Sequence, residues 1–240
     1  VEGTKADDIS KVFNKIPLSR RLDVKEVTLD FSSSMENAVL ASFPNARLTI
    51  DRFHVQQLVT EALQEMRVRL RWKAIEEENR AVKQAKQSGT RYTPEVYTND
   101  DTKKQLLARS RYLLFKSSSN WTDRQKQRAV ILFETFPELK TAYELTMCFR
   151  GIYETSQTRE EAERRFTEWF QKVDASSFDS FKTVAHYLED HLDTILNYFP
   201  DRSTNASAES FNAKLKGFRS LLRGVCDKKF FLFRVAKLYA

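Results

Sequence analysis

The segment that decides the fold runs from residue 24 to residue 51 and reads VKEVTLDFSSSMENAVLASFPNARLTID. Two short runs at 24–29 and 46–50 have a strand-like pattern, and each is followed by an aspartate. Between them, residues 34–43 carry apolar side chains at helical spacing until Pro44 and Asn45 interrupt the pattern. The segment therefore predicts a strand, a helix and a second strand, as in one layer of an α/β fold.

Directly after Asp51 the hydrophobic period changes to that of a helix. One apolar stripe runs from Val55 to Leu70 at spacings of three and four residues, with basic residues on the polar side of its second half. We expect a long amphipathic helix over residues 52–87, because Ser, Gly, Thr and Pro residues between 88 and 94 then interrupt it. The polar stretch up to Lys104 is predicted as a loop.

Residues 104–199 are predicted to be helical throughout. Thr122 and Thr158 each begin a capping-box pattern, in which a Gln or Glu three residues later bonds back to the start of the helix. Each pattern is followed by an apolar stripe rich in Phe and Trp. The fold class is therefore predicted as α/β and predominantly helical, with a large all-α domain that has an aromatic core.

The positive charge of the chain gathers at its C-terminal end. The 240 residues include 40 Lys and Arg against 33 Asp and Glu, a net charge of +7. The run 198–200 is expected to stop the preceding helix, and after a small polar stretch Glu209 opens a strongly basic helix with Lys214, Lys216, Arg219 and Arg223. A positive field of this kind attracts polyanions such as nucleic acid.

Composition excludes several other classes of protein. Five Gly and five Pro are too few for the turns of a many-stranded sandwich or barrel. Two cysteines cannot build a disulfide framework or a Cys-rich zinc site. No apolar run approaches the roughly 20 residues that span a bilayer, and residues 1–15 have the pattern of neither a signal peptide nor a transit sequence. We expect a cytosolic protein with no membrane partner.

Asp30 and Asp51 are candidates for chemistry, since each ends a predicted strand at the edge where α/β sheets place catalytic groups. Taken singly, each is more commonly a turn residue or a helix N-cap. His54 lies three residues after Asp51 on one helical turn, so the two side chains could converge on a metal, a phosphate or a hydrogen-bond network. An unrelated histidine beside a capping aspartate is an equally good explanation.

Glu209 shares a helix face with Asn212 and Lys216, so it could bind a divalent metal while its neighbours meet phosphates. On position alone, ordinary first-turn placement favoured by the helix dipole explains Glu209 better. Phosphoryl transfer needs two or three carboxylates around Mg²⁺ ions. Asp30 and Glu209 meet that need only if the helical domain is an insertion that returns Glu209 to the strands.

Four motifs, taken in order along the chain, resemble one known family. They are Thr28-Leu29-Asp30, Phe43-Pro44-Asn45-Ala46, Asp51-Arg52-Phe53-His54-Val55 and, after Thr204-Asn205, the run Glu209-Ser210-Phe211-Asn212-Ala213-Lys214-Leu215-Lys216. In this order they resemble the DDE-type transposases of bacterial insertion sequences in the ISL-three family. The resemblance covers nearly the whole chain.

The resemblance implies an RNase H-like catalytic core, interrupted by a helical insertion, that cuts and rejoins DNA. Such enzymes use three acidic residues and Mg²⁺ or Mn²⁺, with two ions in the complete enzyme. Asp30 would be the second acid and Glu209 the third, both catalytic and metal-binding, with Asp51 as the alternative second acid. Site support would come from Asp51, His54 and Asn212, and DNA binding from Lys214, Lys216, Arg219 and Arg223.

By the same resemblance, the partial RNase H-like core occupies residues 1–57, the all-α insertion residues 58–199, and the C-terminal core helices residues 200–240. The implied partner is double-stranded DNA, as transposon ends and as target. A homo-oligomer on DNA is implied, in the bacterial cytoplasm and associated with the nucleoid.

The start of the chain departs from the family pattern. The first acid should lie on a strand before the region that matches residues 1–21, and Asp7, Asp8 and Asp23 are poor substitutes. We therefore expect the C-terminal part of a transposase, inactive in strand cleavage by itself. A non-catalytic DNA-binding or dimerisation module that kept the fold is the alternative, and a structure-specific nuclease of the same superfamily is a third possibility.

Overall fold

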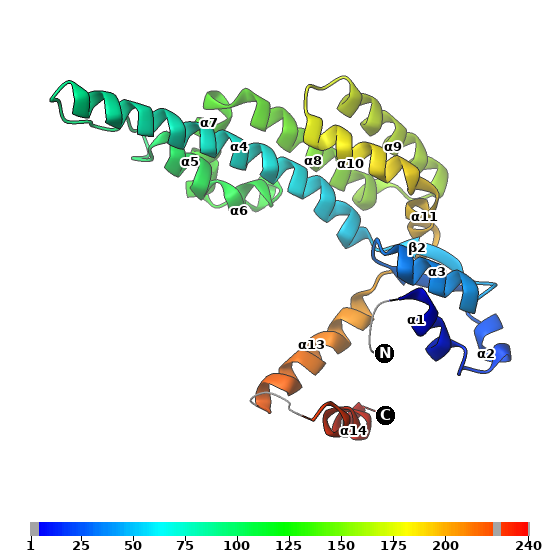
Figure 1. The fold of residues 1–240 in the computed structure, drawn as a ribbon. Coiled ribbons are helices and arrows are strands. Elements are labelled where there is room, and N and C mark those ends of the chain that lie inside the picture. The colour runs from blue at the N-terminus through cyan, green and yellow to red at the C-terminus, as the bar shows by residue number, and fades with distance from the viewer. Residues whose placement is uncertain (1–4, 223–226, 240) are drawn as a thin grey trace. The chain divides into compact units, whose positions relative to one another are not determined.

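The computed structural model describes residues 5–222 and 227–239 (Figure 1). The chain divides into two compact units. Unit 1 combines the residues up to Asp51 with those from Arg202 onward, and unit 2 is the continuous segment Arg52–Asp201. In sequence, unit 2 is thus inserted between two parts of unit 1, whereas the sequence analysis placed the borders after residues 57 and 199.

The sheet of unit 1 has two parallel strands joined by one helix, namely β1 (Glu26–Leu29), α3 (Ser33–Ser42) and β2 (Arg47–Ile50). Leu29 is opposite Ile50 at the last position of the register. The Ser32 hydroxyl caps α3 by accepting the Met35 N–H at 3.4 Å. Parallel strands need a crossover of this kind, and the predicted strand, helix and strand are confirmed.

A small apolar core holds this layer together. It is formed by the buried side chains of Leu29, Val39, Phe43 and Leu48. Phe13 packs against it with its ring centroid 5.1 Å from that of Phe43. Phe13 is the last residue of α1 (Ala6–Phe13), which is followed by α2 (Leu18–Leu22) before the sheet begins. The sequence analysis did not predict these helices, because eight and five residues contain too few turns for a clear period.

Unit 2 is all-α, as predicted for this part of the chain. It begins with the 36-residue helix α4 (Arg52–Gln87), whose predicted bounds are confirmed. The other helices are α5 (Lys103–Arg109), α6 (Arg111–Leu114), the 3₁₀ turn η1 (Ser118–Asn120), α7 (Asp123–Thr135), α8 (Pro137–Thr155), α9 (Arg159–Asp174), α10 (Asp179–Asp190), α11 (Leu192–Leu196) and α12 (Tyr198–Asp201).

Within unit 2, four helices pack against α4. At 1.5 Å per residue it is about 54 Å long, and its buried residues lie mostly in its first half. Helices α5, α6, α8 and α10 all contact it (Figure 1). Arg67, expected on the polar side, is instead only 6% exposed.

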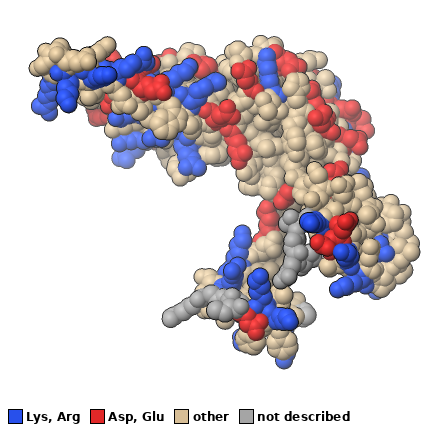
Figure 2. Space-filling view, viewed as in Figure 1, with Lys and Arg blue, Asp and Glu red and all other residues tan. Residues whose placement is uncertain are grey.

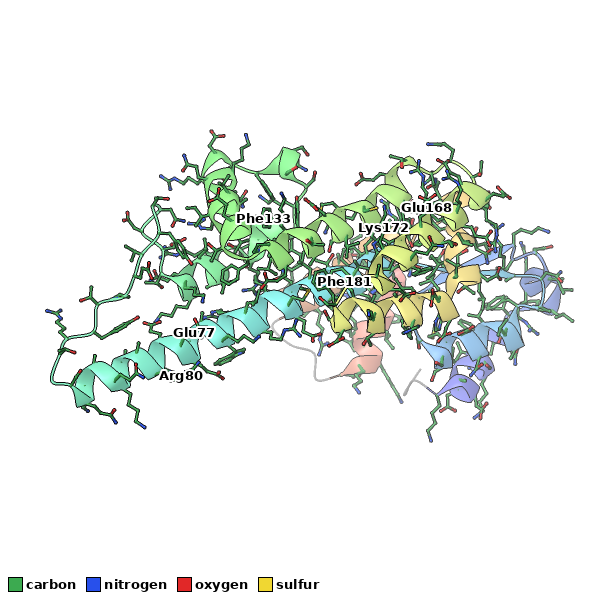
Figure 3. All side chains as sticks on the ribbon, turned by 90° about the horizontal axis from the view of Figure 1, so that it is seen from above. Glu77, Arg80, Phe133, Glu168, Lys172 and Phe181 are labelled. Carbon is green, nitrogen blue, oxygen red and sulfur yellow. The ribbon has the colours of Figure 1, made fainter. Side chains whose placement is uncertain are left out.

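An aromatic core stabilises unit 2, as predicted. Trp169 is fully buried, donates its indole N–H to the Leu145 carbonyl at 2.9 Å and has its ring 4.7 Å from that of Phe149. Phe181 of α10 is also buried inside the bundle (Figure 3). Each buried side chain of this size contributes about 2 kcal/mol from removal of apolar surface from water.

Two local predictions were wrong in part. The expected stop at residues 198–200 is a short helix, because Pro200 lies within a first turn, where its missing N–H is not needed. The capping box at Thr122 is complete, but that at Thr158 is not. The Glu161 carboxylate accepts the N–H of Gln157 at 2.9 Å instead of bonding back to Thr158.

The C-terminal part of unit 1 is a pair of helices, α13 (Ala206–Leu221) and α14 (Lys228–Tyr239). The first of them begins three residues earlier than Glu209, at an N-cap formed by Asn205. Ring contacts join the two helices, Phe211 to Tyr239 at 5.5 Å and Phe218 to Phe231 at 5.7 Å. None of the described residues of α13 and α14 is buried, and Figure 2 shows several Lys and Arg side chains on this part of the chain, among apolar ones.

In the part of the chain that the structure describes, no helix is both long enough and apolar enough to cross a membrane. Cys148 is an exposed free thiol, and Cys226 lies outside the described residues. Arg223, one of the predicted DNA-binding residues, also lies outside them.

Candidate functional site

The two strands of unit 1 place Asp30 and Asp51 at one edge of the sheet. Each aspartate directly follows the last residue pair of the parallel register, Leu29 with Ile50. The Asp51 N–H continues the ladder by donating to the Leu29 carbonyl at 2.8 Å. Because parallel strands end on the same side, both carboxylates leave the sheet at its carboxyl edge, where α/β folds bind their ligands.

Asn205 contacts both aspartates. Its backbone N–H donates to Asp51 Oδ2 at 2.7 Å, and its side-chain amide donates to Asp30 Oδ1 at 3.1 Å. The two carboxylates differ in access, since Asp51 is only 3% exposed whereas Asp30 is exposed. The Asp51 carboxylate is therefore occupied by the backbone of Asn205, whereas the Asp30 carboxylate is accessible to an external ligand.

Glu26 attaches the segment before α13 to the sheet. Its carboxylate accepts the Ser203 hydroxyl at 2.7 Å and the hydroxyl of Thr49 on the neighbouring strand, and it lies 3.4 Å from the Arg47 guanidinium. Glu26 was missed in the sequence, and Asn205 was noted only as part of the Thr204-Asn205 motif. A polar residue at an otherwise apolar strand position was the available signal for Glu26.

Glu209 lies one helical turn after Asn205 on α13. Its N–H donates to the Asn205 carbonyl at 2.8 Å, so the backbone of the two residues is separated by about 6 Å along the helix axis. The Glu209 side chain is exposed. Among the described residues, no group of three or more His, Cys, Asp or Glu side chains is arranged to hold a metal ion. The structure thus brings Asp30 and Asp51 to Asn205, while the Glu209 carboxylate is not gathered with them.

The other predicted site residues are distributed over both units. His54 belongs to the first turn of α4 in unit 2, with its ring 5.7 Å from that of Phe53. Its convergence with Asp51 stays a prediction. Asn212 is exposed on α13 three residues after Glu209, and the exposed basic residues of the same helix are Lys214, Lys216 and Arg219.

Comparison with known proteins gives the family. The sequence model of the DDE_Tnp_ISL3 family, described as a transposase, matches residues 1–235. The chain is also similar to the transposase for insertion sequence element IS1001 of Bordetella parapertussis, at 22% identity over 223 residues. That alignment covers 93% of this chain and 49% of the relative, so the chain spans about half the length of the curated protein it matches. No solved structure matches the chain.

The match extends over both units, from the residues before the sheet to the last helix. The predicted resemblance is therefore confirmed at the level of the family. This chain belongs to the transposase family of insertion sequences that this sequence model describes.

Proposed function

We propose that this chain carries part of the catalytic core of a DDE-type transposase, which cleaves a DNA phosphodiester and joins the freed 3′ end to a target strand. The observation that carries this proposal is the arrangement at the carboxyl edge of the sheet. Two aspartates from neighbouring strands are tied by Asn205 to the helix that bears Glu209. In this proposal the sheet and α13 belong to an RNase H-like core.

The donor set at this edge fits a hard divalent cation. Asp30 offers exposed carboxylate oxygens, and Mg²⁺ is commonly bound by one or two carboxylates together with waters and substrate phosphates. When bound, Mg²⁺ or Mn²⁺ would stabilise the charge that develops on the phosphate oxygens and activate the attacking hydroxyl. Two ions are expected in the complete enzyme.

We assign Asp30 the role of second catalytic acid because it is exposed at the strand end. Asp51, nearly buried and accepting a backbone N–H, holds the start of α13 in register with the sheet. Glu209 is the proposed third acid, since the turn that bears it begins at the residue bonded to both aspartates. His54 and Asn212 would support the site. The first acid would come from sequence outside this chain, which would then be inactive in strand cleavage by itself.

The DNA backbone would lie along α13 and α14. These helices contain seven basic residues and one acid, Glu209, and Asp227 directly precedes α14. Lys214, Lys216 and Arg219 are exposed on the helix that carries the third acid, so they can neutralise phosphates close to the cleaved bond. A homo-oligomer on double-stranded DNA, in the bacterial cytoplasm, is the expected working form.

A second candidate function is a non-catalytic DNA-binding or dimerisation module. The exposure of the Glu209 side chain and the absence of a three-carboxylate group among the described residues favour it. The two candidates differ in one measurable respect, because only the enzyme loses strand cleavage when a single carboxylate is removed while DNA binding is retained.

The test uses the protein expressed from its complete natural reading frame, with a supercoiled plasmid that carries the element and its ends, in Mg²⁺. We expect Asp30→Ala and Glu209→Ala each to lower cleavage by at least about 100-fold, the size of effect seen when one electrostatic element of an active site is removed. The matched control is Glu163→Ala, which removes an exposed acid on α9. DNA binding should be unchanged in all three variants.

Two outcomes would contradict the assignments. Unchanged cleavage by Asp30→Ala or Glu209→Ala would remove that residue from the site, and a wild-type protein that binds the ends without cleaving them would establish the non-catalytic module. Asp30→Cys and Asp51→Cys separate a metal ligand from a positioning residue, because a soft thiolate accepts Mn²⁺ more readily than Mg²⁺. Cleavage restored by Mn²⁺ is expected for Asp30→Cys only.

A further inference from the structure

A groove lined by both polar and apolar side chains runs along one face of α4, entirely within unit 2. It has a volume of about 660 Å³ and is bordered on the far side by Arg111, Phe115 and Arg150. The α4 residues that line it recur at spacings of three and four between Phe53 and Val68. They therefore form a single helix face about 22 Å long. Helices α6 and α8, which supply the two arginines of the far wall, both contact α4 (Figure 1).

Three arginines meet in this groove, and protein carbonyls hold two of them. Arg67 donates to Gln64 Oε1 at 2.7 Å and to the Leu107 carbonyl at 2.9 Å. Arg150 donates to the Phe115 carbonyl at 2.7 Å and to the Thr60 hydroxyl at 3.5 Å. The Nε of Arg150 is buried and has no hydrogen-bond partner among the described residues.

Within the described ranges, neither Arg67, Arg111 nor Arg150 forms an ion pair. Burial lowers the pKa of Arg67, and the nearby charges of Arg111 and Arg71 lower it further. Glu61, the acid that borders the groove, also lines a second pocket and bonds to Gln57 at 2.7 Å.

Arg67 is buried and Arg150 is partly buried, and a positive charge held away from water is costly unless an anion joins it. Guanidinium groups with unused N–H donors bind phosphate in particular, since their fork of donors matches two phosphate oxygens. The part of the groove lined by Arg67, Arg111 and Arg150 is therefore cationic, forms no ion pair with any described residue, and suits a phosphate group.

The groove also contains two aromatic residues. Phe53 is 61% exposed at the first turn of α4, and Phe115 is half-buried on the opposite wall, where its carbonyl accepts from Arg150. An exposed aromatic ring beside a cationic groove is the combination on which an unpaired nucleobase stacks while its phosphates bind to arginine. Gln56 and Gln57, which lie on α4 between Phe53 and Thr60, supply amide donors and acceptors that suit base edges.

We propose that this groove binds a short unpaired stretch of a DNA strand, with one base stacked on Phe53 and the following phosphates held by Arg150, Arg111 and Arg67. The inference rests on the proposed function only in that the chain acts on DNA. In this proposal unit 2 binds an unpaired strand, whereas α13 and α14 bind the backbone of duplex DNA.

The test measures binding of fluorescent oligonucleotides by the full chain in EDTA, so that cleavage plays no part. We expect single-stranded DNA to bind more tightly than blunt duplex of the same length. Arg111→Ala and Phe53→Ala should each weaken single-strand binding by about tenfold, and Arg111→Ala should lower the slope of log affinity against log salt by about 0.7. Arg69→Ala is the matched control, an exposed arginine of α4 that does not line the groove.

Both substituted side chains are exposed, so the fold should survive, and unchanged circular dichroism checks this. Arg150→Lys is a further variant that keeps the charge but loses the fork. Equal loss of single-strand binding in Arg69→Ala and Arg111→Ala would overturn the proposal, as would a preference for duplex. Displacement of the bound oligonucleotide by an acidic peptide at lower concentrations than by unlabelled single strands would overturn the proposal and identify a protein partner instead. Failure of the cleavage test with intact Arg111-dependent binding would overturn the catalytic assignment alone.

Discussion

The side-chain amide of Asn205 donates a hydrogen bond to Asp30 at 3.1 Å, although the two residues are 175 positions apart in the sequence. The whole of unit 2 lies between them in the chain. Asn205 is also the N-cap of α13, yet its side chain makes no cap hydrogen bond. The Asn205 amide therefore connects the start of α13 to the sheet through Asp30.

Asn205→Asp should make the edge of the sheet dependent on divalent metal. It places a third carboxylate against Asp30 and Asp51, and like charges in contact destabilise one another. We expect faster hydrogen exchange in residues 26–51 in EDTA and a return to wild-type protection in millimolar Mn²⁺. Asn205→Ala is the control, because it loses about 2 kcal/mol of charge-assisted hydrogen bonding without gaining a ligand. Rescue of the Ala variant by Mn²⁺ would contradict the prediction.

Glu26→Gln should loosen the segment that leads into α13. The carboxylate accepts hydroxyl hydrogens from Thr49 and Ser203, and loss of its charge should cost about 2 kcal/mol locally. The measurement is amide exchange at residues 203–209, which should quicken by about 30-fold for that free energy. Glu36→Gln on α3, whose side chain has no such partners among the described residues, should leave that exchange as it was.

Asp101→Asn should destabilise unit 2. Asp101 is fully buried and accepts from Arg109, from Arg128 at 3.0 Å and from Asn99 at 3.0 Å. Removing the charge should cost about 2 kcal/mol, equivalent to a fall of about 6 °C in Tm. The neighbouring Asp100→Asn is the matched control, because its φ of 60° is one that Asn also adopts readily. Equal Tm values for the two variants would show that the buried ion pairs contribute nothing.

Replacing Lys214, Lys216 and Arg219 together by Ala should reduce the salt dependence of duplex DNA binding. Each phosphate contact that is lost lowers the slope of log affinity against log salt by about 0.9, so three contacts should lower it by about 2.7. The control replaces three exposed basic residues of unit 2, Arg124, Lys140 and Lys172. If the slope of log affinity against log salt falls equally in both triple variants, DNA binding depends only on the net charge of the chain and not on where the basic residues lie.

Much of the fold could be predicted because its signals are local. The change of hydrophobic period after Asp51 predicted the start of α4, and the helix-breaking residues at 88–94 predicted its end. The alternation at 46–50 predicted β2 to within one residue. The sequence also predicted that Asp30 and Asp51 end neighbouring strands, since parallel strands joined by one helix leave little choice of topology.

The candidate site was harder to predict because it depends on contacts between distant parts of the chain. Nothing near Asn205 in the sequence shows that its side chain bonds to Asp30. Arg67 follows the polar pattern of α4, yet it is buried because the Leu107 carbonyl of α5 accepts its N–H. The role of Glu26 likewise depends on Ser203, 177 positions later. Periodicity reports only which face of an element is covered, and not which distant polar group completes its hydrogen bonds.

The bond of 2.7 Å between the Asn205 N–H and Asp51 has a practical consequence for genetic engineering. Residues 51 and 202, which flank unit 2, must lie close together, because residue 205 touches Asp51 directly. Unit 2 is a continuous segment whose excision leaves a gap that a short Gly-Ser linker can close. Unit 2 can therefore be deleted, or replaced by the same unit of a relative, while the sheet and its aspartates stay in one polypeptide.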